Sequence, residues 1–216
     1  MRSYPVHYAV SRPATFTRLQ LAMRMVAFLA LGVLGLSFGA VFLFAYLALP
    51  VYAASRLGNG RASLAYAEQD GPRVVRALRW FAAVSAWAAL VADRLPGASP
   101  DEVVTLTIET RTPPAEPTAG AALWRVITGL PSALVLGVLG FVGSFVWLWA
   151  ALSILIAQQV GPHAFHYLTG LQRWSVRLLA YQASLVDDYP PFSFEDDPVA
   201  VPPTARVVHG TPRRLS

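Results

Sequence analysis

The sequence predicts an α-helical integral membrane protein that is built from a duplicated unit. Three observations predict this fold class: an apolar composition, two long uncharged runs, and an internal repeat. Of the 216 residues, 55% are apolar and only 13% are charged, whereas soluble domains usually carry about 25% charged residues. This charge density leaves too little polar surface to cover a compact soluble domain, so a cytosolic enzyme and a disordered chain are both poor interpretations.

The two uncharged runs are the predicted membrane helices. No charged residue occurs between Met25 and Ser55, nor between Val126 and Gln172, where the apolar part ends near Ala157. Each apolar run has about 31 residues, which exceeds the roughly 20 that a helix needs to span a bilayer. Each run is predicted to form one uninterrupted helix of about 46 Å, so we expect tilt or extension into the headgroup layer.

A repeat explains the order of the elements. The segment Leu31–Gly35 recurs unchanged 105 positions later as Leu136–Gly140, and an Arg-Trp pair at position 79 recurs 94 positions later as Arg173-Trp174. Each repeat is predicted to hold a short strand, a long transmembrane helix, an amphipathic Arg-Trp helix and a proline turn. The predicted domains are the first repeat at 1–100, the second repeat at 101–197 and a disordered tail at 198–216.

The strands open the repeats and form a small β element. They are predicted at Tyr4–Val10 and Val103–Glu109. The second strand alternates, with Val104, Leu106 and Ile108 on one face and polar residues on the other. A third extended piece is predicted after the two prolines at 190–191.

The Arg-Trp helices are predicted at about Pro72–Ala92 and His163–Val186. Their arginines lie on one side of each helix, and an apolar face with a basic stripe is typical of a helix in the membrane interface, near anionic headgroups. A short tilted span is the alternative. The predicted membrane-interface residues are Arg76, Arg79, Trp80, Arg173, Trp174 and Arg177.

Small residues mark one face of each long apolar run. In lipid, helices associate mainly where small residues let two backbones approach closely. The alternative is that glycine is simply common in membrane helices. We predict a helix-packing role, against the other repeat or a second subunit, for Gly32, Gly35, Gly39, Gly137, Gly140 and Ser144.

The chain offers no convincing reactive centre. Ser37 lies in a G-x-S-x-G pattern, but that motif needs a strand-to-helix turn and not an uninterrupted helix. His163 and His166 could begin a metal site, yet no third ligand is apparent. The acidic stretch 187–197 is predicted to be a solvated turn. We therefore expect no catalytic residue, no metal and no cofactor.

The end of the second repeat is similar to a known family. The segment Arg173–Arg177, then Tyr181, and then Asp187–Ser193 with its Asp-Asp-Tyr-Pro-Pro-Phe-Ser sequence resemble a bacterial membrane-protein family catalogued as a domain of unknown function. The opening Tyr4–Val6 resembles the start of its repeat. The resemblance implies a multi-pass protein of the bacterial inner membrane, and it supplies no catalytic residues.

Charge and length predict the topology. The N-terminal arginines have no acid among them, which predicts a cytoplasmic N-terminus. Two crossings are favoured, because the uncharged stretch Trp80–Ala92 is too short to span a bilayer. Residues 3 and 216 would then share one side, with residue 99 opposite. Four crossings are the alternative, and they would let the two strands pair.

These features predict a non-enzymatic membrane protein that acts as an accessory, scaffold or assembly subunit of a membrane complex. The alternative is a lipid-handling or small-solute transport component, which the duplication favours because transporters often contain internal repeats. The expected partners are the lipid bilayer, including anionic headgroups, and other membrane subunits or a second copy. Nucleic acid is not expected, although the net charge is +5.

Overall fold

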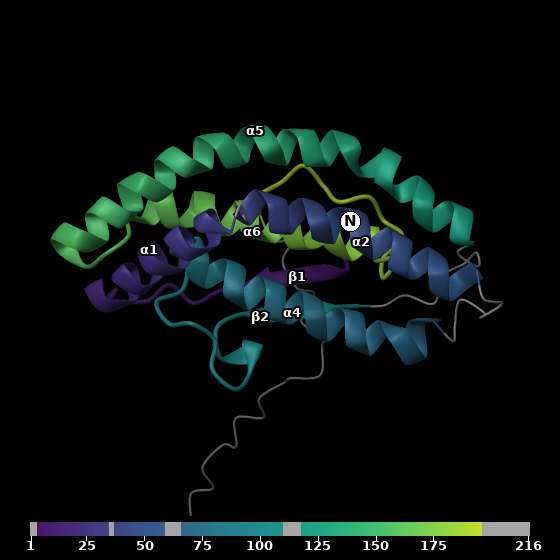
Figure 1. Ribbon diagram of the computed structural model, residues 1–216, viewed down its shortest axis with the longest axis horizontal. Coiled ribbons are helices and arrows are strands. Elements are labelled where there is room, and N and C mark those ends of the chain that lie inside the picture. The colour runs from purple at the N-terminus through teal and green to yellow at the C-terminus, as the bar shows by residue number, and fades with distance from the viewer. Residues whose placement is uncertain (1–3, 35–36, 59–65, 110–117, 196–216) are drawn as a thin grey trace, which may run out of the picture.

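The described part of the chain is mostly helical (Figure 1). The computed structural model describes residues 4–34, 37–58, 66–109 and 118–195. The predicted tail at 198–216 lies outside them. In chain order the elements are β1 (Val6–Ala9), α1 (Arg18–Val33), α2 (Phe38–Gly58), the π-helical turn η1 (Tyr66–Asp70), α4 (Gly71–Ala88), the 3-10 turn η2 (Pro100–Glu102), β2 (Thr105–Ile108), α5 (Ala119–Ala157) and α6 (Pro162–Gln182).

The second long apolar helix is confirmed, and it is longer than predicted. At the start of α5 the Thr118 hydroxyl accepts a hydrogen bond from the backbone N–H of Ala121 (3.1 Å). Such a side-chain cap satisfies one of the free N–H groups of a first helical turn. The helix ends where Gln158 adopts a left-handed conformation with φ 55°. In Figure 1, α5 arches over the whole length of the molecule.

The prediction of one continuous helix from Met25 to Ser55 is wrong. α1 ends at Val33 and α2 begins at Phe38. Glycine and serine are weak helix formers, and four of them lie between positions 32 and 39. The Ser37 hydroxyl accepts the backbone N–H of Ala40 (3.0 Å), as an N-cap does. The serine of the G-x-S-x-G pattern therefore caps the start of α2.

Among the residues that the structure describes, two helical segments are long and apolar enough to cross a membrane, Gly39–Gly58 and Ala119–Ala157. Their most apolar windows are only 28% and 22% buried in the chain. A core helix of a soluble protein passes the same test of length and composition, but it would be mostly buried. These helices instead leave most of their apolar surface uncovered.

The two strands form an antiparallel pair in which Tyr8 lies opposite Leu106. Both side chains are buried, and for Leu106 this agrees with the predicted alternation of the second strand. Each strand is shorter than predicted, and within the described residues no strand follows Pro191. The pairing is incompatible with the favoured two-crossing arrangement. That arrangement places residues 3 and 99 on opposite sides of a membrane, whereas paired strands must lie on the same side.

The Arg-Trp helices are confirmed as α4 and α6, although both end earlier than predicted. α6 lies at the centre of the molecule, where it packs against α5, α4, α2 and β1. The half of α6 that ends at Gln182 is almost wholly buried. One hydrophobic core contains residues from both predicted repeats, so the two halves fold around shared contacts.

Candidate functional site

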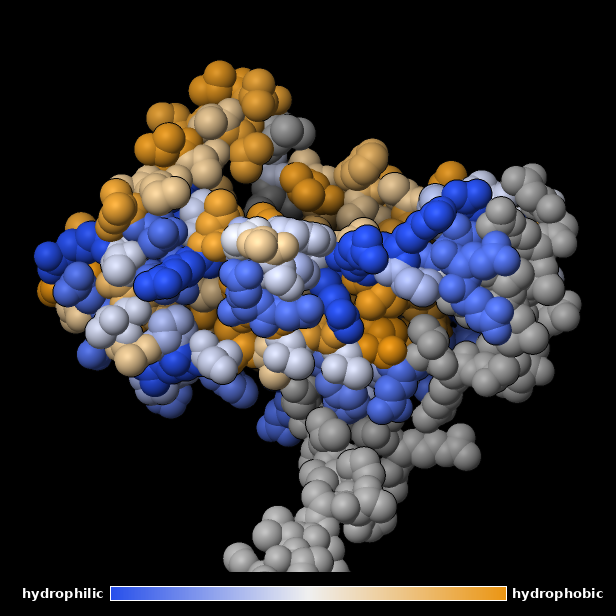
Figure 2. All heavy atoms as spheres, turned by 90° about the horizontal axis from the view of Figure 1, so that it is seen from below, coloured by the Kyte–Doolittle hydropathy of each residue, from blue (hydrophilic) through white to orange (hydrophobic). Residues whose placement is uncertain are grey.

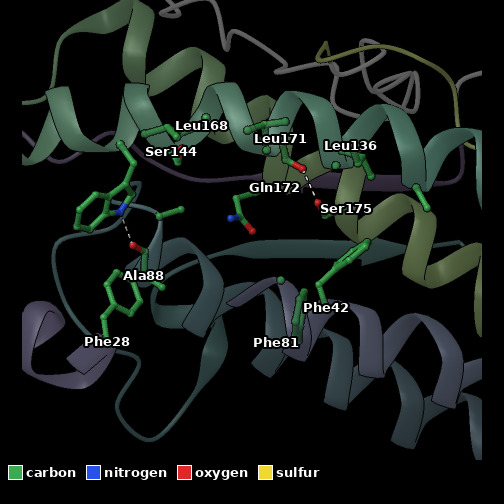
Figure 3. Close-up of a pocket in the computed structure, with 17 residues that line it drawn as sticks. Phe28, Phe42, Phe81, Ala88, Leu136, Ser144, Leu168, Leu171, Gln172 and Ser175 are labelled. Atoms are coloured by element: carbon green, nitrogen blue, oxygen red, sulfur yellow. Dashed lines mark hydrogen bonds between the residues drawn. The ribbon is translucent and has the colours of Figure 1, made fainter. Parts of the chain in front are cut away.

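An apolar groove lies among the described helices (Figure 3). Its volume is about 520 Å³, within the range of about 300–1,000 Å³ typical of ligand pockets. Three phenylalanines line one side, Phe28 from α1, Phe42 from α2 and Phe81 from α4. Opposite them, α5 contributes mostly small residues. The amide of Gln172, from α6, points into the middle of the groove.

One wall of the groove is fixed by a hydrogen bond. The indole N–H of Trp147 donates to the carbonyl oxygen of Ala88 at the end of α4 (2.8 Å). The same indole packs against the ring of Phe28, with ring centroids 5.6 Å apart. These contacts hold α1, α4 and α5 together at this end of the groove. The groove is therefore part of the folded chain and does not depend on a partner.

The structure brings most of the predicted packing residues together at this groove. Gly39, Gly137, Gly140 and Ser144 all line it. A Cβ added at Gly137 or Gly140 would meet no atom within 4 Å, and the same holds at Gly32. Within the chain these glycines therefore make no close helix contact. Their predicted packing role now concerns only a partner outside the chain, and Gly35 lies outside the described residues.

Other glycines, which the sequence analysis missed, do make close contacts. A Cβ at Gly143 would lie 2.8 Å from the Cδ1 atom of Leu171 on α6. A Cβ at Gly129 would collide with the side chain of Gln182, and it would lie 2.9 Å from the hydroxyl of Tyr46. The sequence signal for these contacts was a seven-residue spacing of buried positions on α5. The four residues with this spacing are Gly129, Leu136, Gly143 and Ala150. Such a spacing places residues on one side of a helix.

A buried arginine holds the end of α4. The guanidinium group of Arg24 donates hydrogen bonds to the carbonyl oxygens of Trp87 (2.7 Å), Ala92 and Asp93 (2.8 Å). It also lies over the indole ring of Trp87, 5.2 Å from the ring centroid. The last carbonyls of a helix lack partners within the helix. Arg24 supplies such a partner where Leu90, with φ 60°, turns the chain out of the helix.

A second arginine holds the end of α6 in the same way. Arg125 donates to the carbonyl oxygens of Tyr181 (2.9 Å) and Val186 (2.6 Å), and to the carboxylate of Asp187 (2.5 Å). Its guanidinium group lies 4.6 Å from the ring centroid of Tyr181. The turn that follows α6 again uses a left-handed residue, Ser184 with φ 55°.

The arginines predicted at the membrane interface contact the strands. Arg79 of α4 donates to the carbonyl oxygen of Leu106 in β2 (3.1 Å), and Arg173 of α6 donates to that of Tyr8 in β1 (3.2 Å). Arg177 is 1% exposed and donates to the carbonyl oxygen of Val6 (3.4 Å). These contacts dock the helices onto the sheet. Of the six residues predicted at the interface, Arg76 is exposed, Arg79, Trp80 and Arg173 are half-buried, and Trp174 and Arg177 are buried.

The aromatic ending of the second repeat covers α6. Phe192 stacks edge to face on Trp174, with ring centroids 5.2 Å apart, and Phe194 lies over Gly170. The hydroxyl of Tyr189 accepts the backbone N–H of Ser132 (3.2 Å) and bonds its hydroxyl (2.8 Å). This segment therefore closes the side of the molecule between α6 and α5.

The described titratable groups form no evident reactive cluster. His163 and His166 are both exposed, and no three His, Cys, Asp or Glu residues within 4–34, 37–58, 66–109 and 118–195 lie close enough to hold a metal ion. Burial raises the pKa of Tyr8 and of Tyr66 above the ordinary value. The hydroxyl of Tyr66 donates to the carbonyl oxygen of Ala183 (2.7 Å), whereas that of Tyr8 is buried without a partner among the described residues.

These features define a helical protein with a shared core, an apolar groove and two helices that are long and apolar enough to cross a membrane. Residues 120–193 match a family described as Domain of unknown function (DUF4389), which confirms the resemblance over this part of the chain. No curated protein and no solved structure matches the chain significantly.

Proposed function

We propose that the chain is a non-enzymatic integral membrane protein that acts as an accessory, scaffold or assembly subunit of a membrane complex. The observation that carries the proposal is the apolar surface that α1, α2 and α5 leave exposed. Leu29, Phe44 and Phe141, one on each helix, are 70%, 74% and 68% exposed. Large exposed apolar surfaces usually mark contacts with a membrane or another protein.

The arginine contacts support a structural role over a catalytic one. Arg24, Arg125 and Arg173 donate hydrogen bonds mainly to backbone carbonyl oxygens, at helix ends or along a strand. Arginine offers five donors in a rigid fork, and in these positions the donors hold backbone elements in place. They are therefore committed to the fold.

The N-terminal charges support a location in the bacterial inner membrane with the N-terminus in the cytoplasm. Arg2, Arg12, Arg18 and Arg24 precede the first apolar run, and no acidic residue lies among them. Segments of this kind are retained on the cytoplasmic side. Arg24 is buried against α4, so the remaining three arginines carry this argument.

The test is membrane extraction at neutral pH. We expect the full chain to stay in the membrane pellet after high-salt and urea washes, because its exposed apolar side chains are held by the hydrophobic effect and not by charge. Mild-detergent purification should then recover stoichiometric protein partners. Release into the soluble fraction by salt or urea would overturn the membrane assignment, and purification of the chain alone would overturn the subunit role.

A second candidate function, lipid handling, is favoured by the groove. A helix with side chains is about 10 Å wide and rises about 1.5 Å per residue, so 520 Å³ would hold only about four residues of one. A flexible hydrocarbon chain fits such a space better. The aromatic and small residues around it form an apolar lining, and Gln172 offers a polar group for an ester or headgroup.

Native mass spectrometry of the purified protein separates the two functions. If the groove holds lipid, a bound lipid should survive mild detergent in the wild type and should be lost in Gly140→Leu, which fills the open space. Leu134→Phe is the matched control, because Leu134 lies on the exposed surface of α5 and outside the groove. Equal lipid retention in both variants would overturn the lipid-handling candidate and leave the subunit role intact.

A further inference from the structure

The pairing of the two strands restricts how the chain can meet a membrane. β1 precedes α1 and β2 precedes α5, and the two strands are joined by backbone hydrogen bonds in one sheet. Both strands must therefore lie on the same side of any bilayer. It follows that the chain between Ala9 and Thr105 crosses either an even number of times or not at all.

A second crossing by α4 conflicts with where the strands lie. Arg79, in the middle of α4, bonds the carbonyl oxygen of Leu106, and it forms an ion pair with the exposed Asp101 (3.8 Å). The strands therefore lie beside the middle of α4, as Figure 1 also shows. If α4 crossed the membrane, an open two-stranded sheet and a carboxylate would sit within the hydrocarbon. Lipid does not tolerate open sheet edges, and buried charges are costly there.

A crossing by α6, in the other half of the chain, conflicts with the position of the strands in the same way. Arg173, near the middle of α6, bonds the carbonyl oxygen of Tyr8 in β1. The strand pair therefore lies beside the middle of both helices, and neither can cross without carrying the strands into the bilayer.

The apolar surface of α5 is also too long for a crossing. Its large exposed apolar side chains begin at Leu123 and continue to Ile156. At about 1.5 Å per residue this stretch is about 50 Å long, whereas the hydrocarbon core of a bilayer is about 30 Å thick. A crossing helix would leave apolar side chains in water at its ends. A helix that lies along the membrane keeps all of them in the hydrocarbon boundary.

The polar side chains lie on the other side of the molecule. Figure 2, seen from the side opposite α5, shows a band of hydrophilic side chains across this face, with apolar surface along one edge. Arg73 and Arg76 of α4 are exposed, and so are Asp101 and Glu102 of η2. The exposed surface is therefore divided between an apolar side, on α1, α2 and α5, and a polar side.

We propose that the apolar surface of α1, α2 and α5 lies along the hydrocarbon of a single leaflet, and that the chain does not cross the bilayer. The partner of this surface is the acyl-chain layer of one leaflet, with α4, α6 and the sheet on the water side. This inference rests on the proposed membrane location, and it replaces both the two-crossing and the four-crossing arrangements.

Single cysteines in the otherwise cysteine-free full chain test the inference. Exposed positions are available before α1 (Ser11), between α2 and α4 (Gln69), before β2 (Ala98) and after α5 (Gln159). Each Cys variant is treated with an impermeant maleimide in intact spheroplasts and in inverted inner-membrane vesicles. Labelling after detergent solubilisation is the control for reactivity.

A chain held in one leaflet should label at all four positions from the same side, in the inverted vesicles and not in the spheroplasts. Two crossings would place positions 69 and 98 opposite 11 and 159, and four crossings would place 69 and 159 opposite 11 and 98. Any position that labels from the other side overturns the inference while leaving the membrane location intact. Loss of the protein from the membrane pellet would instead overturn the proposed function.

Discussion

Arg24 and Arg125 hold the ends of two different helices through matching contacts. The guanidinium group of Arg24 binds the carbonyl oxygens of Trp87 and Ala92, and that of Arg125 binds those of Tyr181 and Val186. Each acceptor in the second half lies 94 positions after its counterpart in the first half. Each guanidinium group also lies over the aromatic ring of the first acceptor residue. This correspondence supports the predicted duplication.

Removing either arginine should destabilise the fold. Arg24→Met would leave carbonyl oxygens at the end of α4 buried without partners, and we expect a loss of about 2–4 kcal/mol in unfolding free energy. For a chain of this size that corresponds to a thermal midpoint lower by roughly 4–16 °C. Arg125→Met should behave similarly, and thermal unfolding of the purified protein in detergent measures both.

Arg76→Met is the matched control for these variants, because Arg76 is on α4 but exposed. Its midpoint should stay within about 2 °C of the wild type, as is usual for an exposed position. An unchanged midpoint in Arg24→Met would contradict the role that we assign to the guanidinium group.

Two buried tyrosines should respond differently to the loss of their hydroxyl groups. Tyr66→Phe removes the donor to the carbonyl oxygen of Ala183, and it should cost about 1–3 kcal/mol because that acceptor is left unpaired. Tyr8→Phe removes a buried hydroxyl that has no partner within the described residues, so it should be neutral or stabilising. Chemical denaturation in detergent compares the two, and a larger loss in Tyr8→Phe would refute this assignment.

Stability should fall at alkaline pH. Burial raises the pKa of Tyr8 and Tyr66 in the folded state, whereas in the unfolded chain these hydroxyls ionise near pH 10. Below about pH 10 both states are protonated, and above it only the unfolded state loses protons, so the folded state becomes less stable as pH rises. The thermal midpoint should therefore decline from about pH 10 upward, and less steeply in the double Phe variant. An equal decline in that variant would show that other groups are responsible.

Two glycines one turn apart on α5 should differ in their tolerance of leucine. Gly143→Leu would force a side chain against Leu171, which lies 2.8 Å from an added Cβ, and should destabilise the monomer by about 1–3 kcal/mol. Gly140→Leu extends into the open groove, so monomer stability should be kept while lipid retention or complex assembly is weakened. Thermal unfolding together with size-exclusion chromatography separates the effects. Equal destabilisation by both changes would contradict the open groove.

The sequence predicted the elements well, because long apolar runs and alternating strands are local patterns. The predicted strand containing Leu106 and the helix containing Trp174 are both present. The prediction of one continuous helix failed because residues that favour a helix end lie inside an apolar run. Glycines and Ser37 separate α1 from α2 in the middle of that run. Composition alone does not reveal such a break.

The site was harder to predict, because its residues meet through tertiary packing. The sequence analysis did not relate Arg24 to Arg125, since Arg125 lies 101 positions after Arg24 and this distance matches neither spacing of the repeat. Arg177 was predicted at the membrane interface from its helical spacing, but the partners that bury it lie in β1 and after Phe194. A spacing rule gives one face of a helix, and it does not identify what that face contacts.

The central claim is that α5 lies along one leaflet, and it predicts where two exposed residues of that helix lie. Ile127 and Leu152 are about 37 Å apart along α5 at about 1.5 Å per residue, which exceeds the roughly 30 Å hydrocarbon thickness. Three single-cysteine variants are needed, at positions 127 and 152 and, as the reference, at position 11. Each cysteine carries a nitrobenzoxadiazole fluorophore, and each protein is reconstituted into vesicles in which most molecules expose position 11 outward.

The measurement is the fraction of fluorescence that impermeant dithionite removes from outside these vesicles. If α5 lies along one leaflet, the fractions at positions 127 and 152 should both equal the fraction at position 11. If α5 crosses, one of the two positions should be bleached only after the vesicles are permeabilised, and that result would contradict the account.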